Sequence, residues 1–225
     1  MAVGADALAV DGAAMTARNA AIWYARDGFE PASKGINGRR VAGESFLKGF
    51  LRHGAVSEFA LISRSADEIA PVRALGAALR PEVPLRHVPL SRPAGIAPQR
   101  TMFFPSPNFT AEAWRRAPYG TANWSICGVT HTISTAAVMQ GFFDLRMGPV
   151  MPWDAVICTS AAVLGAVSHQ MDLIDDHIRR HLRAEPPPRP MLPVIPLGVH
   201  CDDFARDPAA GAALPFGAAA LGAWA

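Results

Sequence analysis

A glycine-containing loop is the first segment of this chain whose residue types are suited to binding an anion. It spans residues 34–40, reads KGINGRR and precedes a predicted helix. Glycines let the backbone approach a ligand closely, and the first turn of a helix offers unpaired N–H groups to anions. An ordinary turn between a strand and a helix explains the same residues, because glycine is the commonest turn former.

Two known phosphate motifs do not fit this loop. It contains no G-x-G-x-x-G pattern, and Gly38–Ser45 has only the spacing of a P-loop. Glu44 stands where that motif requires lysine, and its carboxylate would repel phosphate. Anion binding at this loop would therefore rest on the glycines and on the start of the helix.

His131 is the histidine best placed for chemistry, since it lies at the end of a predicted strand and stands between two threonines. Its imidazole could bind a sugar hydroxyl or stabilise developing charge. A structural histidine beside an apolar strand is the alternative.

Three further histidines, His169, His177 and His181, occupy one predicted helix. A spacing of four residues places two imidazoles on one helix face, which is compatible with a metal site. The stretch lacks the H-E-x-x-H pattern and is densely charged, so a solvated helix face is the better interpretation and we expect no metal ligands.

Apolar runs and turn residues predict the elements that position these groups. Strands are predicted at residues 22–24, 58–63, 85–90, 101–104, 124–132, 154–158 and 194–199, and the run from Asp154 should be fully buried. Helices are predicted at 41–53, 111–116 and 161–183, with one more capped by Ser134 and one running to Leu79. That last helix begins either at a Ser65–Glu68 capping box or at Pro71, and Thr159 or Ser160 caps the helix at 161.

Alternating strands and helices predict a single α/β domain with a doubly wound, mostly parallel sheet of the Rossmann-like kind. Ligands of such sheets bind beyond the carboxyl ends of the strands. The small, polar and basic residues predicted at that edge are Gly35, Asn37, Gly38, Arg39, Arg64, Thr130, His131, Thr159 and Ser160. They suit an anionic or polyhydroxyl ligand.

Composition narrows the function classes. Half of the 225 residues are hydrophobic, 18% are charged and the net charge is +2, which favours a packed domain and gives a nucleic-acid partner little support. No apolar run approaches the length of about 20 residues that a membrane span needs, which leaves only peripheral membrane contact open. Three widely spaced cysteines and no convincing signal peptide favour a reducing, cytoplasmic setting with buried free thiols.

Three ordered segments resemble one protein family. They are residues 34–43 (KGINGRRVAG), 124–132 (WSICGVTHT), and 153–160 (WDAVICTS) followed by 193–199 (PVIPLGV). Together they are similar to the acceptor-side domain of bacterial family-4 glycosyltransferases of the GT-B fold, over about residues 22–204. The Pro-Leu-Gly-Val stretch resembles the crossing from the first domain to the second.

The resemblance implies two Rossmann-like domains, of which the first binds the acceptor and the second a nucleotide sugar. Gly35 and Gly38, with Arg39, would face the donor diphosphate, and His131 would be the catalytic residue facing the transferred sugar. Transfer would retain the anomeric configuration, with the nucleotide sugar as co-substrate and no metal or other cofactor. The remaining edge residues, Asn37, Arg64, Thr130, Thr159 and Ser160, become candidates for the acceptor side.

The chain departs from the family where the donor-binding domain is expected. We interpret residues 1–21 as a loose leader, 22–204 as the acceptor-side domain and 205–225 as an Ala/Gly-rich linker or truncated end. A natural half-domain, a gene fragment and a frameshifted reading all stay open, and we expect no sugar transfer by this chain alone. The alternative function is a stand-alone binding module that needs a separate donor-domain chain. For the site we expect an open depression lined by Gly35, Gly38, His131 and Thr159.

Overall fold

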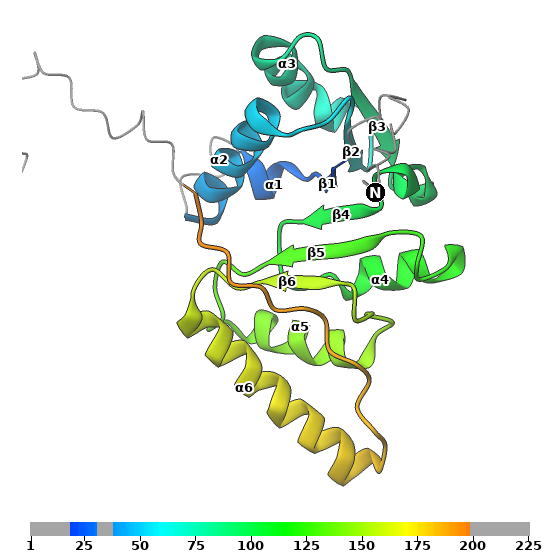
Figure 1. Cartoon of the computed structure of the whole chain (residues 1–225), viewed down its shortest axis with the longest axis vertical. Coiled ribbons are helices and arrows are strands. Elements are labelled where there is room, and N and C mark those ends of the chain that lie inside the picture. The colour runs from blue at the N-terminus through cyan, green and yellow to red at the C-terminus, as the bar shows by residue number, and fades with distance from the viewer. Residues whose placement is uncertain (1–18, 31–37, 199–225) are drawn as a thin grey trace, which may run out of the picture.

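Parallel strands form one sheet at the centre of the molecule (Figure 1). The computed structural model describes residues 19–30 and 38–198, apart from the side chain of Arg39. Within this part the sheet has six strands in the order β3-β2-β1-β4-β5-β6. The strands are β1 Ala21–Trp23, β2 Phe59–Ser63, β3 Leu85–Pro89, β4 Thr101–Phe104, β5 Ser125–Val129 and β6 Ala155–Ile157. The predicted α/β, doubly wound, Rossmann-like class is thereby confirmed.

Helices connect the strands and cover both faces of the sheet (Figure 1). The α-helices are α1 Arg26–Phe29, α2 Gly38–His53, α3 Ala70–Leu79, α4 Thr110–Arg116, α5 Ala136–Met147 and α6 Ala161–His177. Short 3-10 turns are η2 Asp67–Ile69, η3 Pro93–Gln99 and η4 Ala117–Tyr119, and a π-helical turn, η5 Ile178–Leu182, extends α6.

The alternation of side chains along each strand divides the core into two layers. Ile22, Leu61 and Phe103 pack with α1, α2 and α3 on one face. Their strand neighbours, Ile62 and Met102 among them, pack with α4, α5 and α6 on the other. Both faces of the central strands are therefore buried, as parallel sheets require.

Helix starts follow local capping chemistry, with two differences from prediction. Ser160 caps α6, its hydroxyl accepting a hydrogen bond from the Val163 amide at 3.2 Å. The α5 cap is Thr135, so the prediction of Ser134 was wrong by one residue. The predicted Ser65–Glu68 capping box is absent, because the Glu68 carboxylate instead accepts from the Arg64 amide at 3.1 Å.

The alternative start predicted for this helix is the one observed. Pro71 lies in the first turn of α3, where its missing N–H removes no intrahelical hydrogen bond.

The outer side of β6 is covered by an extended segment and not by another strand. Two isolated parallel bridges, Ala155↔Met191 and Cys158↔Val194, run along it. The predicted strand at 194–199 was wrong within its described part, 194–198, because Pro193 and Pro196 have no N–H to continue a ladder. The run 154–158 was predicted to be fully buried, and it is buried except at Ile157, which is half-buried.

Two buried ion pairs fix this side of the sheet. Arg116 and Asp154, both with fully buried side chains, form two hydrogen bonds of 2.6 and 2.7 Å. Arg146 donates to Asp175 at 2.7 Å and also to the Pro187 and Pro188 carbonyls at 2.6 and 3.1 Å. The second pair therefore anchors the proline-rich segment that leads to the cover of β6.

Candidate functional site: a pocket beside helix α2

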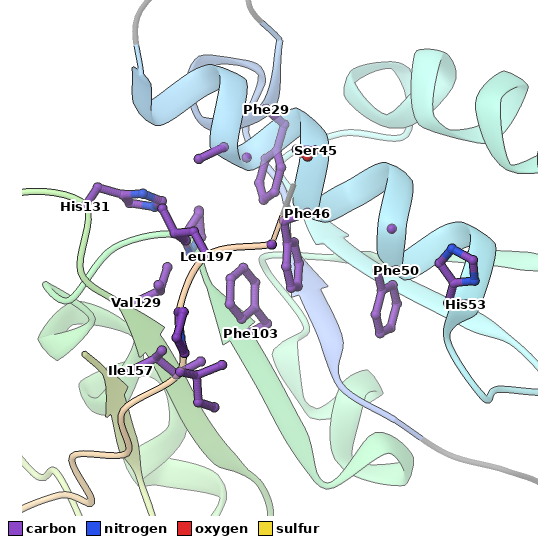
Figure 2. A pocket seen from close by; sticks show the side chains of 17 residues that line it. Phe29, Ser45, Phe46, Phe50, His53, Phe103, Val129, His131, Ile157 and Leu197 are labelled. Carbon is purple, nitrogen blue, oxygen red and sulfur yellow. The ribbon is translucent and has the colours of Figure 1, made fainter. Parts of the chain in front are cut away.

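The order of the sheet reverses between β1 and β4, which are neighbours although two strands separate them in the chain. Such a switch point leaves a crevice at the carboxyl ends of the strands, and ligands of open α/β sheets bind there. A cavity of about 400 Å³ lies at this place, lined by Phe29 after β1, Pro105 after β4 and His131 after β5. We call it the α2 pocket, because one face of α2 forms its wall (Figure 2).

The wall of the α2 pocket arises from helical periodicity. Ala42, Ser45, Phe46, Gly49 and His53 line it at successive spacings of three, one, three and four residues, which places them on one helix face. Phe46 stacks on Phe103 of β4 with ring centroids 4.1 Å apart. This aromatic contact holds the helix face against the sheet while leaving the rest of the face open.

Close contact with α1 fixes the position of α2. A Cβ on Gly43 would lie 2.0 Å from the Gly28 carbonyl oxygen, so only glycine allows the two helices to approach this closely. The buried Arg40 side chain forms an ion pair with Asp27 at 2.6 Å. Both contacts set the distance between the α2 wall and the sheet.

The floor of the pocket is formed by the carboxyl ends of two neighbouring strands. Val129 and Ile157 present apolar side chains at the ends of β5 and β6. Residues 195–198 form the far rim, held to β6 by the hydrogen bond from the Ile195 amide to the Cys158 carbonyl at 3.0 Å. Among the described lining residues there is no Asp, Glu, Lys or Arg, so the interior favours a neutral, apolar ligand.

The polar side chains of the pocket are Ser45 and two histidines. In Figure 2, His131 and His53 lie at opposite ends of a row of rings that includes Phe46. His131 is half-buried and stands at the carboxyl edge, two residues after the end of β5. A ligand with an apolar body and one polar end would match this arrangement.

The predicted phosphate loop is described only from Gly38 onward. Gly35 and Asn37 lie outside the described residues, as does the side chain of Arg39. Gly38 is the first residue of α2 and does not line the pocket. Of the described residues predicted to share a depression, only His131 lines the α2 pocket, and Thr159 does not.

Thr130, Thr159 and Ser160 take part in the backbone structure of the edge. The buried Thr130 hydroxyl donates to the Ile157 carbonyl at 3.0 Å and accepts from the Thr159 amide at 3.3 Å, which joins the ends of β5 and β6. The Ser160 hydroxyl caps α6. These interactions position His131 and Ile157, and they leave Thr130 no exposed hydroxyl for a ligand.

Arg64 lies on another part of the carboxyl edge. It follows β2, which is separated from β4 by β1, and it does not line the α2 pocket. Its side chain is exposed, and its backbone N–H donates a hydrogen bond to the Glu68 carboxylate in the turn before η2. The structure therefore does not bring Arg64 together with His131.

The histidines of α6 and η5 form no metal centre in the part of the chain that is described. No group of three or more His, Cys, Asp or Glu side chains there could hold a metal ion. The rings of His177 and His181 stack with centroids 4.7 Å apart, and both residues are exposed. Nearby, Asp172 and Asp175 pair with Arg189 at 2.7 and 2.5 Å.

Both described cysteines are free thiols, and Cys201 lies outside the described residues. Burial, and then the charge of Asp154, raises the pKa of Cys127 to about 11. Burial also raises the pKa of Cys158. Raised values keep both thiols protonated at neutral pH, which opposes a nucleophilic role.

Sequence reasoning missed most of the pocket. Ala42, Ser45, Gly49 and His53 were predicted only as part of a helix, and their spacing of three or four residues does not by itself mark a pocket wall. Nothing in the sequence marked Phe29 and Phe103 as pocket residues, because their place in the lining depends on how α1 and β4 pack in three dimensions.

Comparisons of the chain with family models, with curated proteins and with solved structures gave no significant match. Within the described ranges, no helix has the length and hydropathy needed to cross a membrane.

Proposed function

We propose that this chain carries the acceptor-side domain of a retaining nucleotide-sugar glycosyltransferase. The observation that carries the proposal is the α2 pocket at the switch point of the sheet, with His131 at its mouth. Support comes also from the ordered resemblance of residues 34–43, 124–132, 153–160 and 193–199 to that family. The widely spaced cysteines suit a cytoplasmic setting.

In this proposal the donor and the acceptor bind at different parts of the carboxyl edge. The start of α2, with no acidic residue in its first turn, offers N–H groups to the donor diphosphate. Gly38 and Arg39 are its first residues, and Gly35 precedes them in the sequence. The acceptor enters the α2 pocket and presents its hydroxyl near His131. The imidazole then hydrogen-bonds the transferred sugar and stabilises charge that develops during transfer.

Donor binding by these groups alone is weak. Interactions with a helix end contribute about 0.3–1 kcal/mol each. Two or three of them give roughly millimolar affinity or weaker, once the loss of ligand freedom is subtracted. A donor-binding domain, on the same polypeptide or on another, completes the site in this proposal.

Amide chemical-shift mapping with a nucleotide sugar, such as UDP-glucose, tests the proposal. We expect shifts at the start of α2 and at His131, with a dissociation constant of about 1 mM or weaker, the value set by two or three helix-end contacts. In an active complex with a donor domain, His131→Ala should lower turnover about 10²–10⁴-fold, with little change in folding stability. Micromolar donor binding, or shifts confined to the amino ends of the strands, would overturn the assignment.

A stand-alone binding module is the second candidate, favoured by the neutral lining of the pocket, which by itself requires no reaction. The two candidates differ in the role of His131. A binding module tolerates His131→Ala with a change in ligand affinity only, whereas a transferase domain loses turnover at saturating acceptor.

A further inference from the structure

We infer that the α2 pocket binds a neutral alkyl chain, so that the acceptor is an amphiphile whose polar head lies at His131. The inference rests on the acceptor-side assignment and names the substrate class. It starts from the lining, in which Phe29, Phe46, Phe50 and Phe103 provide rings and no described residue provides a charge.

The size of the pocket fits a small molecule better than a protein element. Ligand pockets typically enclose about 300–1,000 Å³, and this one encloses about 400 Å³. An apolar cavity of about 150 Å³ is enough to bind benzene. The α2 pocket therefore has room for a group more than twice that size, but not for a whole packed helix.

The shape of the pocket favours a chain over a compact ring system. Its lining runs along α2 from Ala42 to His53, a distance of about 16 Å at 1.5 Å rise per residue. His131 and His53 lie at opposite ends in Figure 2. His131 stands at the carboxyl edge, where the proposed transfer takes place, so the polar head belongs at that end and the chain extends toward Phe50 and His53.

A substitution at Gly49 can fill this space without changing any other lining residue. A Cβ built on Gly49 meets no atom within 4 Å, and the residue lines the pocket in the middle of α2. The Cβ of a leucine there has free space, its longer side chain extends into the cavity, and leucine favours the helix. Gly165 in α6 is a matched control, because its Cβ also meets nothing within 4 Å and it lies outside the pocket.

The experiment measures binding of n-octyl β-D-glucopyranoside, below its micelle concentration, by calorimetry on the full chain. Methyl β-D-glucopyranoside is the comparison ligand, since it keeps the sugar and removes the chain. Each buried methylene should strengthen binding about fourfold. We expect the octyl ligand to bind at least tenfold more tightly than the methyl one, with Gly49→Leu removing that advantage and Gly165→Leu keeping it.

Three results would overturn the inference. The octyl and methyl ligands could bind equally in the unsubstituted chain, or Gly49→Leu could bind the octyl ligand as well as Gly165→Leu does. Nuclear Overhauser contacts between the Phe46 ring and residues of the segment 199–225 would show that the chain itself fills the pocket. None of these readouts uses a nucleotide sugar, so donor mapping at the start of α2 tests the transferase assignment separately.

Discussion

The two ends of strands β5 and β6 differ sharply in how they use polar groups. At the amino ends, the buried Asp154 carboxylate accepts four hydrogen bonds, two from Arg116 and one each from the Ile126 and Met151 amides. At the carboxyl ends, Val129 and Ile157 border a cavity of about 400 Å³. A buried ion pair with a fully hydrogen-bonded carboxylate marks the end that must hold the fold, and unfilled apolar space marks the end available to a ligand.

The largest effect is expected from removing the carboxylate of Asp154. Asp154→Ala leaves the fully buried Arg116 charge without its partner, and breaking such a pair costs about 3–5 kcal/mol. Urea denaturation followed by circular dichroism measures the free energy of unfolding. Asp176→Ala is the control, since Asp176 pairs with Arg179 and Arg180 at the surface and should change stability by at most about 0.5 kcal/mol. Equal effects of the two substitutions would contradict the comparison.

Cys127 lies between the two regions and should react slowly. Its pKa of about 11 exceeds the ordinary thiol value of about 8.5, so alkylation by iodoacetamide at pH 8 should be on the order of hundredfold slower than for an exposed cysteine. Peptide mass spectrometry in a Cys201→Ser background follows Cys127 and Cys158 separately. A rate for Cys127 in the folded chain equal to that of an exposed cysteine would contradict the raised pKa.

The same pKa shift predicts the direction of an alkaline effect on stability. Between about pH 8.5 and 11 the unfolded thiol is ionised while the folded thiol stays protonated, so the unfolded state binds fewer protons. The contribution of Cys127 is therefore fully present below about pH 8.5 and is lost as the pH rises through 11. Urea denaturation at a series of pH values should show a steeper alkaline loss than in Cys127→Ala.

The smallest effect is expected at the open end. Gly49→Leu should raise the free energy of unfolding by about 0.5–1 kcal/mol, because leucine favours the helix and its Cβ meets no atom within 4 Å. Gly165→Leu should give a similar gain. Thermal melts of both variants check this, and a clear loss for Gly49→Leu alone would mean that the pocket is already filled.

Much of the fold could be predicted because it depends on local patterns. The strand at 101–104 was predicted with its observed bounds, since prolines at 105 and 107 end it. Thr159 or Ser160 was predicted to cap the helix at 161 from the position before an apolar periodic run, and Ser160 is the cap observed. The predicted strand at 194–199 was wrong within its described part, 194–198, because its apolar pattern suits a strand while Pro196 has no N–H for a ladder hydrogen bond.

The candidate site could be predicted only in part. His131 was identified because it ends an apolar strand, and it does line the pocket. Thr130 carries the same local signal, yet its hydroxyl is used to join β5 to β6. Local sequence does not distinguish a hydroxyl that faces a ligand from one that closes a strand end.

The sequence by itself determined the alternation of strands and helices and the place of the carboxyl edge, because hydrophobic period and turn chemistry act over a few residues. Only the tertiary structure decided that Arg116 meets Asp154 and that Phe46 meets Phe103 while the neighbouring floor stays open. These partners lie 38 and 57 residues apart, and their meeting depends on the order of strands in the sheet. A pocket formed from such distant segments has no local pattern from which it could be read.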